Sequence, residues 1–283
     1  MNRILVPTDF SANANKALDY AVHLCKQLGG ELYIVHAVEL ADTLVGDRTG
    51  TTAHYNDTIK TEAESMLKLL RESISETENI PVYTGIYNND VAGSINEVVQ
   101  HKMIRYVVMG TLGGSGLKEK IFGSKTASFI SQTQVPVFVI PLEAEWQGIQ
   151  NILLAVRDFE NLTAKAKPAL TIADSFNAVV QLATISEKDS PDLMLTLVQE
   201  WELMKCRQEI QSSFPDITLQ TMALKGGSIT AALEEYTRSG TDLLAMLTYK
   251  RNFLTSLFKP SITKQMSYQT KIPLLVIPVD TKN

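Results

Sequence analysis

The sequence contains few of the residues that build metal centres and disulfide frameworks. Among 283 residues there are two cysteines, Cys25 and Cys206, which lie far apart and outside any CxxC motif. Each falls in a helical pattern, which favours a buried free thiol in a reducing compartment. The 4 histidines are scattered along the chain, so no metal-binding set is visible. A disulfide-stapled fold and a zinc site are therefore not expected.

Long apolar runs and an excess of positive charge are missing as well. No apolar run approaches the roughly 18 residues that indicate a transmembrane helix. The chain enters an apolar strand pattern at residues 3–6 without the basic and apolar regions of a signal peptide. Lys and Arg total 26 against 31 Asp and Glu, a net charge of −5, whereas nucleic acids and anionic membranes attract basic surfaces. We expect a cytoplasmic protein that binds neither nucleic acid nor membrane.

Apolar runs of strand type alternate with amphipathic helical patterns throughout the first half of the chain. The expected strands are residues 4–6, 32–38, 80–87, 106–109 and 137–140, and the helices between them are 12–28, 57–78, 91–101 and 126–132. Ser11 and Asp90 are the expected N-caps of the first and third helices, and residues 39–56 form a long loop. The alternation predicts an α/β fold with a doubly wound parallel sheet and helices on both faces.

The same pattern then begins again. Residues 153–159 (LLAVRDF) lie over residues 4–10 (ILVPTDF), and apolar runs at 179–185, 219–224, 243–247 and 272–278 repeat strands two to five. This recurrence predicts a duplication into two domains, residues 1–142 and 151–283, joined by a linker at residues 143–150.

A glycine-rich stretch at residues 106–126 (YVVMGTLGGSGLKEKIFGSKT) reads as strand, loop and helix start. Glycines let backbone N–H groups approach an oxyanion, and a helix start adds unpaired N–H donors, which suits the phosphates of a nucleotide. The stretch is not a Walker A loop, because Ser124 separates Gly123 from Lys125. The dinucleotide fingerprint GxGxxG fails at Glu119.

The spacing Gly110-x2-Gly113-x9-Gly123-Ser124 after a strand resembles the nucleotide motif of the universal stress protein family, and the resemblance covers the whole first half. It implies five-stranded sheets of order 3-2-1-4-5, whose ligands bind where the winding reverses between strands 1 and 4. It also implies an adenine nucleotide, namely ATP or else AMP or ADP, with or without Mg. The residues that match the family's contacts are Pro7, Thr8, Asp9, Ala37, Met109, Gly110, Thr111, Gly113, Gly123, Ser124, Lys125 and Thr126.

The resemblance implies a role for each part of this set. Asp9 would meet the ribose or adenine, and Ala37 would bind adenine through its backbone N–H and C=O groups. The glycines would lie at the phosphates, and residues 124–126 at the β- and γ-phosphates. Two alternatives stay open from the residues themselves: Asp9 as a cap of the first helix, and His36 as a core histidine without a ligand.

The second half lacks the motif. Leu247, Lys250 and Pro260 fall on the three motif glycines, and only Ser261 falls on Ser124. We therefore expect nucleotide in the first half alone, with a variant site around Lys250 and Arg251 as the alternative.

The resulting function is that of a nucleotide-binding protein in stress response or signalling. An interaction module without ligand and a slow ATP hydrolase are the alternatives, although no general base positioned for water is visible. The resemblance also implies pairing through the fifth strands, which are apolar edge strands that need a partner. Because the two copies are covalently linked, we expect them to pair with each other as an intramolecular pseudo-dimer. A further homodimer is left open.

Overall fold

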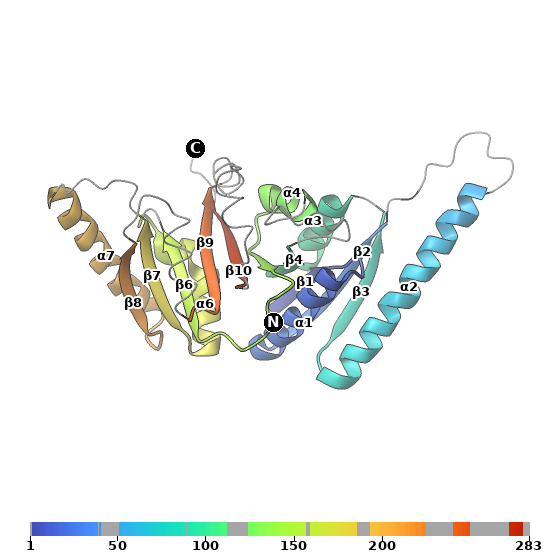
Figure 1. Cartoon of the computed structure of the whole chain (residues 1–283), viewed down its shortest axis with the longest axis horizontal. Helices are drawn as coiled ribbons and strands as arrows, with labels where there is room; N and C mark the ends of the chain where they lie inside the picture. Colours follow the sequence, from blue (N-terminus) through green and yellow to red (C-terminus); the bar gives the residue numbers. More distant parts are fainter. Residues whose placement is uncertain are drawn as a thin grey trace.

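The computed structural model describes residues 2–38, 40, 51–88, 90–111, 124–156, 159–185, 193–224, 240–249 and 272–279. Within them, ten strands form a single sheet of order β3-β2-β1-β4-β5-β10-β9-β6-β7-β8 (Figure 1). The first half contributes β1 (Asn2–Pro7), β2 (Gly30–Ala37), β3 (Val82–Tyr87), β4 (Tyr106–Gly110) and β5 (Val137–Ile140). The second contributes β6 (Asn151–Val156), β7 (Val179–Ile185), β8 (Leu219–Leu224), β9 (Leu243–Tyr249) and β10 (Leu274–Val279). Both halves have the predicted order 3-2-1-4-5.

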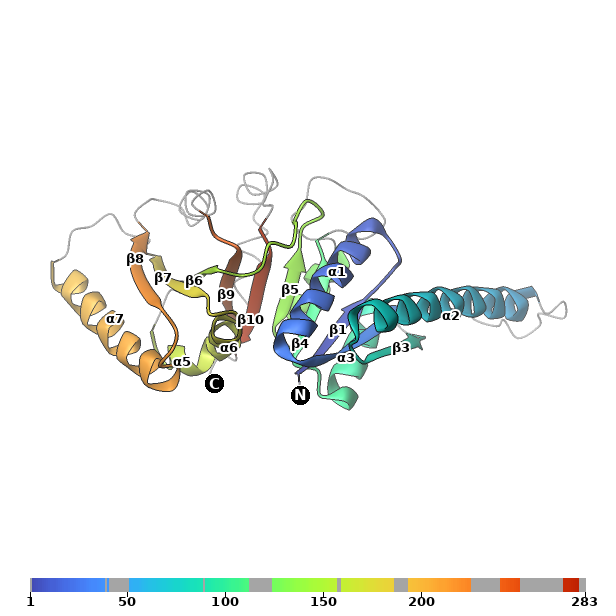
Figure 2. The ribbon, with the colours of Figure 1, turned by 90° about the horizontal axis from the view of Figure 1, so that it is seen from below.

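The helices of the first half are α1 (Ala12–Leu28), α2 (Thr51–Glu78), α3 (Val91–Lys102) and α4 (Ser124–Gln132). The predicted caps are confirmed: the Ser11 side chain accepts a hydrogen bond from the Ala14 N–H group, and the Asp90 side chain accepts one from Gly93. The start predicted for α2 is wrong, because the helix begins six residues before position 57. Its first turns extend beyond the sheet (Figure 2) and leave Tyr55 58% exposed, so no apolar periodicity marks them.

In the second half, the helix that follows the first strand is broken in two. The structure has α5 (Leu162–Lys165) and α6 (Lys167–Phe176), with Pro168 in the first turn of α6, followed later by α7 (Leu193–Ser213). The one-to-one overlay of residues 153–159 on residues 4–10 is shifted by one position. Ile4 pairs with Tyr106, and it is Ile152 that pairs with the equivalent Leu243. A shift of one residue changes the face on which a strand side chain lies.

The core lies in two layers, one on each face of the sheet. On one face, α1, α2, α5, α6 and α7 cover a single apolar cluster that runs through both halves without interruption. On the other face, α3 and α4 cover Leu5, Val107, Val139 and their neighbours. Cys25 and Cys206 are buried free thiols, as predicted, and burial raises the pKa of each to about 11. No helix among the described residues is both long and apolar enough to cross a membrane.

The two halves meet at a seam formed by β5, β10, α1, α6 and the linker. Strands β5 and β10 pair antiparallel, with Phe138 opposite Leu275 (Figure 2), which is the predicted intramolecular arrangement. Below them, the Gln27 side chain donates a hydrogen bond to the carbonyl oxygen of Ser175 at 2.8 Å. The Tyr106 hydroxyl donates to the carbonyl oxygen of Pro168 at 3.2 Å. The seam is therefore tied by backbone pairing and by polar contacts between the helical layers.

Candidate functional site

The loop after β1 has a backbone fixed by its own side chains. The Thr8 N–H group donates to the Val35 carbonyl oxygen at 2.8 Å, which extends the contact between β1 and β2 by one residue. The buried Thr8 hydroxyl accepts from the Phe10 N–H group at 3.0 Å, and a carboxylate oxygen of the exposed Asp9 accepts from Ser11 at 3.1 Å. Phe10 has φ +60, a left-handed value that these bonds help to hold. Pro7, Thr8 and Asp9 therefore form a fixed turn at the carboxyl end of β1.

His36 lies beneath this turn as a structural residue. Its Nδ1 atom is 2.7 Å from the Thr8 carbonyl oxygen, and its ring is 4.7 Å from the Phe10 ring, centroid to centroid. The half-buried imidazole thus joins β2 to the turn after β1. This geometry matches the interpretation of His36 as a core histidine whose hydrogen bond is satisfied.

Ala37 presents backbone groups at the point where β1 has ended. The N–H and C=O groups of successive strand residues alternate between the two neighbouring strands. Val35 bonds toward β1 through its carbonyl oxygen, and the Val38 N–H group bonds toward β3 at Tyr87. By this alternation, the N–H and C=O groups of Ala37 point to the β1 side. In the strand registers Ala37 has a partner in β3 and none in β1, whose last pair is Pro7 with Val35.

The end of β4 is tied to the start of α4. The buried Thr126 hydroxyl donates a hydrogen bond to the Gly110 carbonyl oxygen at 3.0 Å, and the Thr111 N–H group donates to Ile140 at 3.1 Å. Lys125 is exposed in the same first turn of the helix. The structure thus brings Gly110, Thr111, Lys125 and Thr126 together at the carboxyl edge of the sheet, next to the end of β1.

Packing requires a glycine at position 110, which the sequence analysis did not predict. A Cβ atom at this position would lie 2.8 Å from the carbonyl oxygen of Asn13 and 3.1 Å from its Cβ atom, which is closer than real Cβ contacts allow. The glycine therefore lets the first turn of α1 pack directly against the end of β4. Phosphate approach is not needed to explain it.

Asn13 is a candidate site residue that sequence reasoning missed. Its Oδ1 atom is buried and has no hydrogen-bond partner among the residues that the structure describes, although buried polar atoms are nearly always paired. The signal was present in the sequence, because residue 13 lies four positions before Ala17, on the side of α1 that is otherwise apolar. An acceptor without a donor, at the edge between β1 and β4, is suited to a ligand hydroxyl or amino group.

Several predicted site residues are placed elsewhere or are not described. The Met109 side chain is buried in the cluster beneath α3 and α4, so only its backbone is available to a ligand at the edge. Gly113 and Gly123 lie outside the described residues, as does the side chain of Ser124. Lys250, Arg251, Pro260 and Ser261, the positions compared in the second half, are outside them as well.

The residue of the second half that is equivalent to Gly110 is a buried leucine, Leu247. Leu247 pairs with Ile277 of β10, as Gly110 pairs with Ile140 of β5, so the two positions are equivalent. The Leu247 side chain is buried in the same cluster as Leu162 of α5. A leucine side chain thus occupies the position, two residues before the end of β9, at which the first half has a glycine against the backbone of α1.

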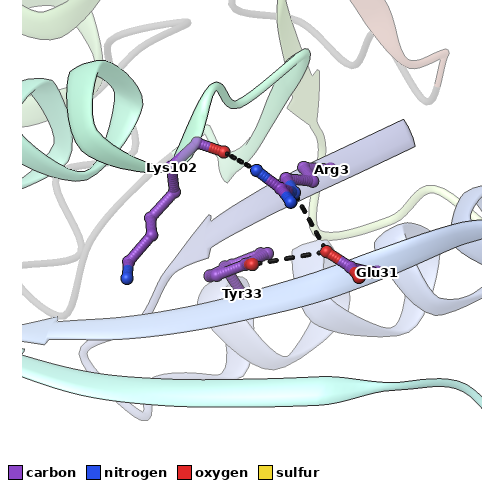
Figure 3. Close-up of polar contacts among 4 residues, drawn as sticks. All are labelled: Arg3, Glu31, Tyr33 and Lys102. Atoms are coloured by element: carbon purple, nitrogen blue, oxygen red, sulfur yellow. Dashed lines mark hydrogen bonds and ion pairs between the residues drawn. The ribbon is translucent and has the colours of Figure 1, made fainter. Parts of the chain in front are cut away.

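A polar cluster at the opposite edge of the sheet is structural. Arg3 Nε is 3.0 Å from a carboxylate oxygen of Glu31, to which the Tyr33 hydroxyl donates at 3.3 Å (Figure 3). Arg3 also donates to the Lys102 carbonyl oxygen at the end of α3 at 2.9 Å. These bonds join β1, β2 and α3 near the start of the strands. Among the described residues, no group of three or more His, Cys, Asp or Glu side chains is placed to hold a metal ion.

Comparison with known proteins gives a consistent answer. The profile of the universal stress protein family matches residues 1–141. Universal stress protein YxiE of Bacillus subtilis is 32% identical over 146 residues, which cover 49% of this chain and 98% of that protein. A universal stress protein structure from Archaeoglobus fulgidus matches 98% of this chain and 96% of its own, with a TM-score of 0.69 and 18% identity.

A putative universal stress protein from Pseudomonas aeruginosa also covers 98% of this chain and 93% of its own, with a TM-score of 0.57 and 15% identity. At these identities the two structures establish the tandem fold alone. The family profile matches the half that carries the glycine motif, and the YxiE match is nearly complete in that protein. The chain belongs to the universal stress protein family.

Proposed function

We propose that the first half binds an adenine nucleotide, with ATP as the main ligand, at the carboxyl edge between β1 and β4. The second half binds none, and the two domains are residues 1–142 and 151–283. One observation carries the proposal: the Thr126 hydroxyl ties the start of α4 to the end of β4 where the sheet reverses its winding. The N-terminal N–H groups of α4 are thereby held at the edge where open α/β sheets bind ligands.

Two further features support the same edge. The N–H and C=O groups of Ala37 are directed past the end of β1 and offer adenine a donor and an acceptor. The buried Asn13 Oδ1 atom supplies an acceptor without a partner, which suits a ribose hydroxyl. In this proposal Pro7, Thr8 and Asp9 form one wall. Gly110, Gly113, Gly123, Ser124, Lys125 and Thr126 form the phosphate end, with Met109 and Thr111 contributing backbone.

Calorimetric titration of the full chain with ATP tests the proposal. We expect a stoichiometry of one and micromolar affinity, about −8 kcal/mol. Millimolar ATP then raises the free energy of unfolding by roughly 4 kcal/mol, which a melting curve detects. Gly113→Lys places a long side chain in the motif and abolishes binding, whereas Lys250→Gly in the second half leaves it unchanged. Absence of binding by ATP, ADP and AMP would favour an interaction module without ligand.

A second pair of variants tests the helix start. Thr126→Val keeps the side-chain volume but removes the hydroxyl that bonds Gly110, so ATP affinity should fall about 5-fold to 10-fold, the loss expected for one hydrogen bond. Thr133→Val is the matched control, because Thr133 is buried next to the other end of α4 and its hydroxyl accepts from Val135. Equal affinities in the two variants would show that the start of α4 does not hold the phosphates.

A further inference from the structure

Helix α7 of the second half carries apolar side chains on two sides. On its inner side, Leu203, Cys206 and Ile210 pack in the large apolar cluster beneath the sheet. On its outer side, Trp201 is 59% exposed and Met204 is 55% exposed. A helix on the surface of a domain normally has a polar outer side, and tryptophan is highly buried on average. The outer side of α7 therefore has the composition of a contact surface.

This surface lies at one end of the molecule. Figures 1 and 2 both show α7 beyond β8, at the opposite end from α2. β8 is the last strand of the sheet, whereas the seam and the proposed nucleotide edge lie farther along it. A second protein molecule that contacts α7 therefore leaves both of them free.

The two exposed apolar residues of α7 can pair with a second copy of themselves. Trp201 and Met204 are three residues apart, a spacing that places them on one side of the helix. When two such helices pack antiparallel about a twofold axis midway between these residues, Trp201 of each copy faces Met204 of the other. The contact between an indole ring and a thioether sulfur is favourable. In addition, Lys205 Nζ lies 5.8 Å from the centroid of the Trp201 ring, which helps to order the ring.

The charges beside this apolar pair also favour a second copy of α7. In the antiparallel arrangement, the position just before the first apolar residue lies next to the position seven residues further on in the partner helix. These positions hold the exposed residues Glu200 and Arg207, whose charges are opposite, and the symmetry forms the pair twice. Within one helix the two residues are about two turns apart and do not meet. On the other flank, Lys205 lies 4.0 Å from Glu209 of its own helix, which reduces repulsion between the copies.

The corresponding helix of the first half lacks this complementarity. Helix α2 exposes Met66 and Leu69 at the same spacing, but the two flanking positions hold Ser65 and Glu72. Two antiparallel copies of α2 would bring no opposite charges together at these positions. The charge pattern therefore selects α7 over α2 as a surface for self-association.

We propose that the outer side of α7 pairs with the same side of a second copy of this chain and so forms a symmetric homodimer. Because the interface is centred on one helix, it is small, and the dimer is transient and forms at high protein concentration. The surface is separate from the nucleotide edge, so either this proposal or the proposed function can fail without the other.

Sedimentation equilibrium of the full chain over a range of concentrations tests the proposal. We expect reversible association between one and two chains. Trp201→Glu removes the central aromatic side chain from both copies and should weaken association at least about 10-fold. Leu69→Glu is the matched control, because it places the same charge on the exposed side of α2, and it should leave association unchanged. Circular dichroism checks that every variant is folded.

Charge reversal provides a second arm. Glu200→Arg and Arg207→Glu each place like charges next to each other across the twofold axis, so each should weaken association about 5-fold. The double variant restores opposite charges and should recover the affinity of the original chain. Because the two residues do not meet within one helix, this recovery requires contact between two chains.

Three results overturn the proposal. The first is the mass of one chain at every concentration, which would leave the surface to a partner of another kind. The second is association that Leu69→Glu weakens as much as Trp201→Glu does. The third is a double charge variant that associates no better than the two single variants.

Discussion

In the first half, Gly110 ends β4 directly against the backbone of Asn13. The Oδ1 atom of Asn13 is a buried acceptor that has no partner within the described ranges. In the second half, the equivalent Leu247 is buried with Leu162 beneath a helix that is broken at Ala166. The strand order of the two halves is the same. One half therefore keeps polar groups at this position, while the other uses the equivalent position for apolar packing. In the proposed function this difference separates the half that binds nucleotide from the half that does not.

Separating the halves should have the largest effect. Residues 1–142 alone lose the β10 partner of β5 and expose an apolar edge strand, which pairs readily with another chain. We expect this fragment to form a dimer, measured as a doubled mass in light scattering. The family profile matches residues 1–141 as one unit, which supports the folding of this fragment. A folded monomer at high concentration would contradict the prediction.

Exchanging the equivalent residues Gly110 of β4 and Leu247 of β9 comes next. Gly110→Leu forces a side chain into the carbonyl group of Asn13, which should lower the free energy of unfolding by about 3 kcal/mol and abolish ATP binding. Leu247→Gly in the second half removes a buried side chain. It should also lower the free energy of unfolding by about 3 kcal/mol, but ATP binding should be retained. Denaturant unfolding and calorimetry measure the two effects. Loss of ATP binding in both variants would remove the proposed difference between the halves.

A smaller change makes the first edge resemble the second. Asn13→Leu replaces a buried acceptor for which the described part of the chain offers no partner, so the free energy of unfolding should rise by about 1 kcal/mol. If Asn13 contacts the nucleotide, ATP affinity falls in the same variant. Asn15→Leu, at an exposed position of the same helix, is the control and should change neither quantity. A stability gain without loss of affinity would show that Asn13 has no part in the site.

The smallest expected effect concerns the one buried thiol of each half, for which we expect the same behaviour. Burial raises the pKa of Cys25 and of Cys206 to about 11, above the unfolded value, so the folded chain binds these protons more tightly. The resulting stability is present below the unfolded pKa and is lost as pH rises through the folded pKa. Both thiols should react slowly with a disulfide reagent at pH 8 and rapidly after unfolding, with single Cys→Ala variants assigning each rate. Fast reaction of one thiol in the folded chain would show that its half opens locally.

Much of the fold was predictable because its signals are local. The span of α1, the caps Ser11 and Asp90, and the strand at residues 137–140 follow from periodicity and capping chemistry, and they agree with the structure. The first turns of α2 gave no signal, because they do not pack on the sheet. The overlay of the repeats was shifted by one residue because apolar runs such as ILV and LLAV look alike in either register, and pairing with β9 decides between them.

The candidate site was predictable only in outline. The glycine spacing pointed to the carboxyl end of β4, where the binding site stays a proposal. The close approach of Asn13 to Gly110 depends on how a helix packs against a strand far away in sequence. The hydrogen bond from the Tyr106 hydroxyl to the Pro168 carbonyl oxygen likewise joins two segments that no sequence motif connects. Such contacts between distant segments arise from the tertiary structure and leave no pattern in a single sequence.

The antiparallel pairing of β5 with β10 has a consequence for how the protein responds to dilution. In a dimer of separate chains, the pairing of fifth strands weakens as the concentration falls, and ligand affinity can change with it. Here the paired strands belong to one polypeptide, so the interface stays formed at any concentration. Nucleotide affinity should therefore be independent of protein concentration, and the nucleotide level alone would set the occupancy of the first half.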